Sequence, residues 1–142
     1  MDPTQCINFL LTDAQNSVNL YFKEMLKQFD VTPAQYMVLY FLKSQGRLTP
    51  SGLSQLCKMD ASTMTGILTR MEKKNLLERQ HSTEDRRQVD ICITKSGEMI
   101  VPDILEVIEQ SNIETLSCLS PHEQVQFKKY LTRISNHLES HE

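Results

Sequence analysis

The 142-residue sequence has only four glycines, and three widespread catalytic motifs are missing from it. It contains no glycine-rich phosphate loop, no nucleophile elbow and no His-Glu-x-x-His pair. Such motifs place reacting groups at tight turns or on one face of a helix. We therefore expect a protein that is not an enzyme and needs no cofactor.

Signals for membranes and disulfides are equally scarce. No apolar run approaches the roughly 20 residues of a bilayer span, and residues 1–6 lack the basic start of a secretory signal. The cysteines stand far apart without a C-x-x-C pair: Cys6, Cys57, Cys92 and Cys118. We expect one cytoplasmic domain over residues 1–142 with free thiols, and we place the last three cysteines, which have apolar neighbours, in its core.

The net charge of −3 hides an uneven distribution. Residues 43–95 hold ten lysines and arginines against six acidic residues, whereas the two flanks together hold five against twelve. A basic middle between acidic ends is typical of a chain in which one surface meets a polyanion.

Helix starts are marked by a capping residue followed by proline, a pair that occurs four times: Asp2-Pro3, Thr32-Pro33, Thr49-Pro50 and Ser120-Pro121. Three of these starts also have Gln or Glu at the third helical position, as in a capping box: Gln5, Gln35 and Glu123. With the apolar period, they predict helices over 3–28, 33–44, 50–57, 61–74, 95–117 and 121–140. Within the fifth helix, Pro102 predicts a bend or a later start.

Between residues 75 and 94 the period changes from helical to alternating. Residues 77–81 and 89–93 are predicted strands joined by a charged tip, and Asn75 and Gly46 are expected to close the helices before them. The predicted fold is mostly α (α+β), with a winged helix-turn-helix in the middle.

The predicted helix 61–74 has two unlike faces. Projection at 100° per residue groups Met64, Ile67, Leu68 and Met71 toward the core. The other side and its flanks carry short polar and basic residues, which suit close approach to DNA bases: Ser62, Thr63, Thr65, Gly66, Thr69, Arg70 and Lys73. A solvated face that happens to be small remains the alternative.

At the hairpin tip, Arg86 and Arg87 can enter the negative potential of a minor groove, and Asp85 can hold one guanidinium in place. A soluble turn without any partner is the alternative here. Two segments, STMTGILTRMEKKNLLER (62–79) and EDRRQVDICITKSG (84–97), resemble the recognition helix and wing of the MarR family of bacterial transcription regulators. Asn75, Thr69 and Ile93 depart from that family's usual glycine, aspartate and leucine.

The resemblance implies a double-stranded DNA-binding regulator, bacterial and commonly a repressor, that binds a pseudo-palindromic operator as a homodimer. It implies helical dimerisation segments at 1–30 and 98–142, a DNA-binding region at 31–97, and a small-molecule effector, aromatic or phenolic, or else an oxidant. Independently, Ile7, Leu10, Leu11 and the C-terminal apolar stripe need a partner for their surface. A dimeric adaptor that has lost DNA binding is the competing hypothesis.

Other candidate sites have weaker support. Cys6 is a possible redox residue, although no basic side chain lies near it in the sequence. His137 and His141 stand four apart, but a pair near a helix terminus is usually solvated, and we assign no metal. Tyr21, Tyr36, Tyr40 and Phe41 can line an effector pocket or belong to the core.

Overall fold

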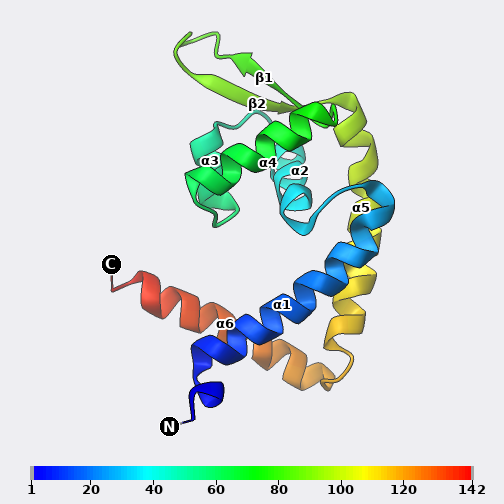
Figure 1. The fold of residues 1–142 in the computed structure, drawn as a ribbon, viewed down its shortest axis with the longest axis vertical. Coiled ribbons are helices and arrows are strands. Elements are labelled where there is room, and N and C mark those ends of the chain that lie inside the picture. The colour runs from blue at the N-terminus through cyan, green and yellow to red at the C-terminus, as the bar shows by residue number, and fades with distance from the viewer. Residues whose placement is uncertain (1, 142) are drawn as a thin grey trace. The chain divides into compact units, whose positions relative to one another are not determined.

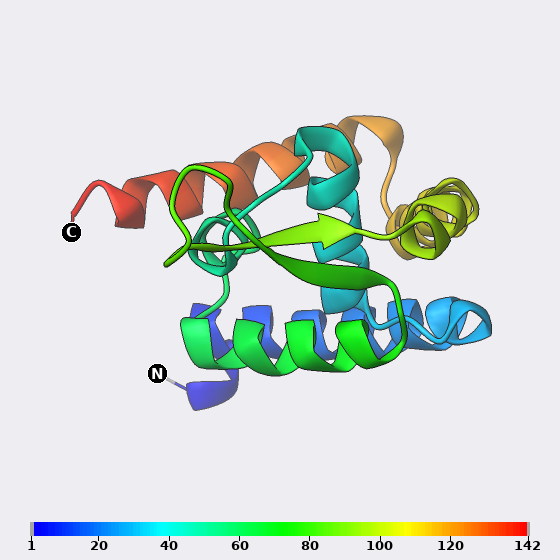
Figure 2. The ribbon, with the colours of Figure 1, turned by 90° about the horizontal axis from the view of Figure 1, so that it is seen from above.

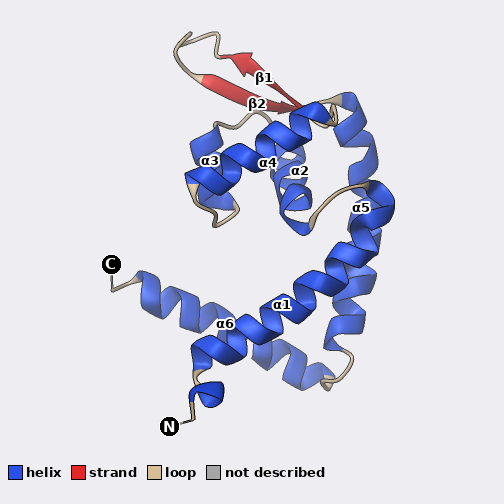
Figure 3. Cartoon of the chain, viewed as in Figure 1, coloured by secondary structure: helices blue, strands red, loops and turns tan. Residues whose placement is uncertain are grey.

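The computed structural model describes residues 2–141 and is mostly helical, with one small antiparallel sheet, as predicted (Figures 1 and 3). Two short 3-10 turns accompany the first helix, η1 (Pro3–Gln5) and η2 (Lys27–Phe29). The helices are α1 (Ile7–Leu26), α2 (Pro33–Gln45), α3 (Pro50–Leu56), α4 (Ala61–Lys73), α5 (Lys95–Leu116) and α6 (Pro121–Glu139). The strands are β1 (Leu77–His81) and β2 (Val89–Ile93), between α4 and α5.

Helix caps confirm three of the four predicted proline starts. Full capping boxes open α2, with Thr32 and Gln35, and α6, with Ser120 and Glu123. The Thr49 hydroxyl accepts the backbone N–H of Gly52 at 3.0 Å and opens α3. Satisfying these N–H groups fixes where each helix begins.

The start predicted at Asp2 was wrong for α1. The Asp2 carboxylate accepts the Thr4 N–H at 2.9 Å, which closes a single 3-10 turn. Cys6 is then extended, with ψ 133°, so α1 begins at Ile7. The aspartate–proline pair therefore caps a turn that the chain does not continue as an α-helix.

The structure also shows how α2 and α4 end and how α5 continues past its proline. Asn75 (φ 58°) follows α4 and Gly46 (φ 80°) follows α2 at positive φ, as predicted. Such conformations end a helix because they turn the next carbonyl away from the axis. α5 runs from Lys95 through Pro102 without interruption, which confirms the predicted start at residue 95 and excludes the later start that was the alternative to a bend.

The wing is a regular two-stranded hairpin. β1 and β2 pair antiparallel from Leu77 opposite Ile93 to His81 opposite Val89, at the predicted bounds. Leu48, in the link between α2 and α3, adds a short bridge to Ile91, with N···O distances of 3.2 and 2.7 Å. The hairpin thus lies beside α4, and the link between α2 and α3 is bonded to it at the middle of β2 (Figure 2).

The chain divides into two compact units, Met1–Ile108 and Glu109–Glu142. In the first unit, apolar residues of α2, α3, α4, the hairpin and the start of α5 form one core that includes Leu39, Leu53, Leu68 and Ile91. The second unit holds the end of α5 and α6, and no residue of α6 is buried. Among the described residues, no helix is both long and apolar enough for a membrane span.

Candidate nucleic-acid interface

α4 presents the two faces that its sequence predicts. The four residues predicted to face the core are all buried: Met64, Ile67, Leu68 and Met71. Of the polar set opposite them, Gly66 and Thr69 are half-buried, and the rest are exposed: Ser62, Thr63, Thr65, Arg70 and Lys73. The orientation of α4 is therefore confirmed, and contact of its outer face with DNA remains a prediction.

The first turn of α4 is fixed by Asp60. Its carboxylate accepts the backbone N–H of Thr63 at 2.7 Å and the Thr63 hydroxyl at 2.8 Å. Both bonds hold the pKa of Asp60 below its usual value, and the bond from the Thr63 backbone has the larger effect. An ionised carboxylate at this end also complements the positive pole of the helix dipole. Thr63 is thus a partner of the cap as well as a candidate base contact.

Two threonines on the outer face are held by their own helix. The Thr65 hydroxyl donates to the Ala61 carbonyl and the Thr69 hydroxyl to the Thr65 carbonyl, each at 2.9 Å. A hydroxyl that donates once still has two acceptor lone pairs. In this arrangement each hydroxyl can accept from the amino group of adenine or cytosine without changing its rotamer.

The tip of the wing is a hydrogen-bonded turn. The Ser82 hydroxyl accepts the N–H groups of Glu84 (3.2 Å) and Asp85 (3.4 Å). The Asp85 carboxylate accepts the backbone N–H of Arg87 at 2.9 Å, in place of the guanidinium that the sequence analysis assigned to it. Arg86 and Arg87 are exposed. The Asp85 side chain therefore supports the wing by binding the backbone of Arg87. The guanidinium groups of Arg86 and Arg87 stay unpaired within residues 2–141.

Arg47 clamps the two strands of the wing near its tip, a role that the sequence analysis missed. Its Nη2 donates to Gln80 Oε1 on β1 at 2.9 Å, and its Nη1 lies 3.9 Å from Asp90 Oδ2 on β2. The Asp90 side chain is only 13% exposed, so the arginine is the counter-charge of a largely buried carboxylate. The one sequence feature that could have pointed to Arg47 was its position next to Gly46, at the end of α2.

Among residues 2–141, the cysteines and histidines belong to no group of three or more side chains that could hold a metal ion. Cys6 is half-buried in front of α1, and its thiol makes no capping hydrogen bond. Cys118 is exposed in the turn after α5, so its assignment to the core was wrong, because α5 ends before it at Leu116. The rings of His137 and His141 meet edge to face at 4.7 Å, and no third metal-ligating side chain joins them.

Aromatic residues gather in the first unit on α2. Tyr40 contacts Tyr36 and Phe41, with ring centroids 6.3 and 5.4 Å away. Burial raises the pKa of Tyr36, and Tyr40 adds to the shift. Tyr40 is 40% exposed, so part of this cluster is open to a ligand.

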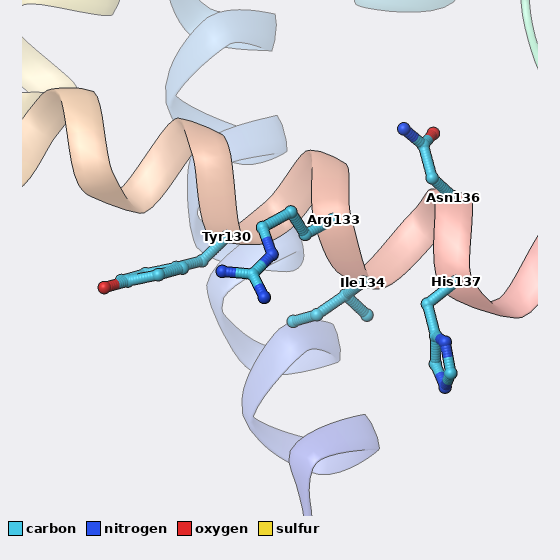
Figure 4. Close-up of a pocket in the computed structure, with 5 residues that line it drawn as sticks. All are labelled: Tyr130, Arg133, Ile134, Asn136 and His137. Atoms are coloured by element: carbon cyan, nitrogen blue, oxygen red, sulfur yellow. The ribbon is translucent and has the colours of Figure 1, made fainter.

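The described residues that line a surface hollow in the second unit all belong to α6 (Figure 4). Tyr130, Arg133, Ile134 and His137 project from one side of the helix, and Asn136 points the other way. Side chains from a single helix face cannot enclose a small molecule. We therefore regard this hollow as part of an apolar helix face and not as a ligand pocket.

A helix-turn-helix with an exposed second helix, followed by an arginine-bearing hairpin, defines the winged-helix class of DNA-binding proteins. Residues 31–89 match the model of the MarR family. The HTH-type transcriptional repressor MdtR of Bacillus subtilis (strain 168) is 31% identical over 140 residues, 94% of this chain and 90% of that protein. The chain belongs to the MarR family and is a DNA-binding transcriptional regulator.

Solved structures agree with this assignment. BpsR of Bordetella bronchiseptica, whose DNA binding is regulated by 6-hydroxynicotinic acid, superimposes with a TM-score of 0.89 at 26% identity, over 95% of this chain and 96% of that one. S. aureus MepR in its complex with DNA superimposes with a TM-score of 0.85 at 25% identity, over 94% and 98%.

Proposed function

We propose that the protein represses transcription by binding a pseudo-palindromic operator as a homodimer. In each half-site the outer face of α4 enters the major groove, and the wing places Arg86 and Arg87 at the flanking minor groove. The observation that carries this proposal is the exposed, short-chained face of α4 in one compact unit with the free guanidinium groups of the wing. The repressor activity is supported by the similarity to MdtR, and the operator places the protein in the cytoplasm.

The homodimer is supported by apolar surface that the single chain leaves uncovered. In α1, Ile7 and Phe9 are 59% and 50% exposed, and in α6, Leu138 is 62% exposed. A two-fold dimer sets its recognition helices about one DNA turn apart, which matches two inverted half-sites.

We also propose an aromatic or phenolic effector that changes the affinity for the operator. The half-open cluster of Tyr36, Tyr40 and Phe41 offers ring faces and hydroxyl groups to such a molecule. The regulation of BpsR by 6-hydroxynicotinic acid supports this chemical class. Oxidation at Cys6 is the alternative signal, supported by a relative that is 29% identical over 99 residues, the organic hydroperoxide resistance transcriptional regulator of Bacillus subtilis (strain 168).

Selection from randomised duplexes, followed by fluorescence anisotropy, tests operator binding. We expect Arg87→Ala to weaken binding to all duplexes by about 3–10-fold and to reduce the salt slope by about one, because one phosphate-region charge is lost. Thr65→Ala should weaken the selected operator more than a scrambled duplex, because a base contact is lost. Lys128→Ala, an exposed cation on α6, is the control for the loss of charge.

The adaptor hypothesis predicts a different result. If the protein selects no duplex, or if binding shows no salt dependence and both variants bind as the wild type does, then the DNA-binding role of this surface is refuted.

A further inference from the structure

We propose that a hollow beside the turn between α1 and α2 binds a small phosphate-type dianion, either inorganic phosphate or the phosphate group of a small ester. The residues that line this hollow come from the end of α1, the turn and the end of α4: Lys23, Lys27, Asp30, Val31, Thr32 and Lys74. All of them belong to the first unit. The described lining contains none of the aromatic residues proposed for the effector.

Three ammonium groups face one carboxylate in this lining. The Lys23 side chain is exposed and pairs with no acidic group among residues 2–141. Lys27 lies 4.0 Å from Glu24, and the two side chains are 78% and 75% exposed, so solvent weakens this pair. The lining therefore has an excess of two positive charges in a chain whose net charge is −3.

Lys74 holds one of these charges in a fixed place. Its Nζ donates to the carbonyl oxygen of Asp30 at 2.5 Å and to Gln35 Oε1 at 3.3 Å, and its side chain is only 30% exposed. Both acceptors are neutral. Its acidic partner is the carboxylate of Asp30, which is 3.4 Å away and 87% exposed. Because an exposed carboxylate compensates a charge weakly, Lys74 is a positioned cation that can still attract an anion.

Thr32 adds a hydroxyl donor to the lysines. Its Oγ1 accepts the backbone N–H of Gln35 at 3.2 Å as part of the capping box of α2. A hydroxyl that accepts one hydrogen bond can still donate its own proton. No residue within 2–141 accepts that proton, so it is available to an oxygen in the hollow.

The size and the donors of the hollow together define the class of ligand. Its volume is about 120 Å³, well below the roughly 300–1,000 Å³ of pockets that hold a ring-bearing molecule. Val31 is the one apolar residue in the described lining, so the walls are also too polar for an aromatic effector. Ammonium groups bind phosphate oxygens as compact point charges and can rotate to meet them. One doubly charged oxyanion satisfies these donors best.

A phosphate of DNA is the competing occupant, and the position of the hollow disfavours it. Lys74 stands at the C-terminal end of α4, whereas the second helix of a helix-turn-helix contacts DNA mainly with its N-terminal residues. Lys23 lies near the end of α1, and Lys27 lies in η2. A small ion in solution can reach this place without any contact between α4 and a groove.

Phosphate titration of the full chain tests the site, with chloride at matched ionic strength as the reference. Phosphorus NMR line widths and the melting temperature follow binding, and we expect both to change saturably in the wild type. Lys23→Gln combined with Lys27→Gln should weaken phosphate binding roughly 10–100-fold, because two charged donors are lost while the bonds of Lys74 remain. Methyl phosphate separates the two sources: tighter binding than that of phosphate identifies an ester as the ligand, and weaker binding identifies the free ion.

Asp30→Asn gives a test in the opposite direction. It removes the negative charge that repels the anion, and asparagine tolerates the left-handed conformation of residue 30 (φ 52°). We expect this variant to bind phosphate about fivefold more tightly. Lys128→Gln combined with Lys129→Gln removes two exposed cations from α6 and should bind phosphate as the wild type does.

Three results would overturn the inference. The first is a wild type that shows no saturable binding, and the second is equal phosphate affinity of the wild type and the variant of Lys23 and Lys27. In the third, measured without phosphate, this variant loses at least about tenfold more operator affinity than the α6 control, which would assign the lysines to DNA. Failure of the wild type to select an operator would refute the proposed function and leave the phosphate site standing.

Discussion

Because Gly97 has no side chain, the start of α5 can pack closely against the backbone that follows α4. A Cβ at this residue would lie 2.2 Å from the carbonyl oxygen of Leu76, at the exit from α4. Thr94 strengthens the same junction, since its N–H donates to that carbonyl at 3.1 Å and its hydroxyl donates to the Asn75 carbonyl at 2.6 Å. The first turn of α5 is therefore packed directly on the backbone that follows α4.

Gly97→Ala should destabilise the protein by about 1–3 kcal/mol, because the added methyl group forces the two backbones apart. Gly66→Ala is the matched control, since it adds the same atom at an open helical site and should raise stability by up to about 1 kcal/mol. Urea unfolding followed by circular dichroism measures both. Equal stability of Gly97→Ala and the wild type would show that the junction can relax without cost.

At the scale of elements, the clamp made by Arg47 holds the wing to the body. The clamp reaches across 33 residues of sequence to Gln80 and further to the largely buried Asp90. Next to it, the bridge between Leu48 and Ile91 extends the hairpin by a third short segment. Together these contacts fix the direction in which the wing projects from α4.

Arg47→Ala should loosen the wing, because Asp90 loses its counter-charge and Gln80 loses a donor. The Arg47 side chain is 46% exposed, so solvent weakens its interactions. We therefore expect the local stability of the wing to fall by about 1 kcal/mol, which corresponds to roughly fivefold faster hydrogen exchange at the amides of β1 and β2. Operator affinity should fall as well, since Arg86 and Arg87 are less well placed. Lys43→Ala, an exposed cation near the end of α2, controls for the charge. Unchanged exchange in the strands would contradict the clamp.

Local patterns in the sequence predicted most elements of this fold, because the decisive contacts are local. Capping pairs such as Thr32 with Gln35 involve residues three positions apart, and hairpin bounds follow from alternation. The start of α1 was missed because a proline cap is compatible with both a 3-10 turn and an α-helix. The clamp of Arg47 was missed because its partners are distant in sequence.

At the scale of the whole molecule, both compact units leave apolar surface uncovered. α6 has 19 residues and none is buried, although Val125, Phe127, Tyr130, Ile134 and Leu138 are all apolar or aromatic. Of the 20 residues of α1, Leu26 is the buried one. Amphipathic helices draw most of their stability from packing of the apolar face, so each unit requires a partner for this surface.

We expect this partner to be a second copy of the chain, so that sedimentation equilibrium gives twice the monomer mass and the melting temperature rises with protein concentration. Phe127→Ser combined with Ile134→Ser should weaken the dimer by at least about 2 kcal/mol, roughly 30-fold in Kd, because two buried apolar contacts are lost. The same variant should lose its preference for an operator with two half-sites over one with a single half-site. Lys128→Ala combined with Lys129→Ala changes two exposed residues of the same helix and should change neither property. A wild-type protein that sediments as a monomer at all concentrations would require a different partner for α6, and operator recognition through a two-fold dimer would fail with it.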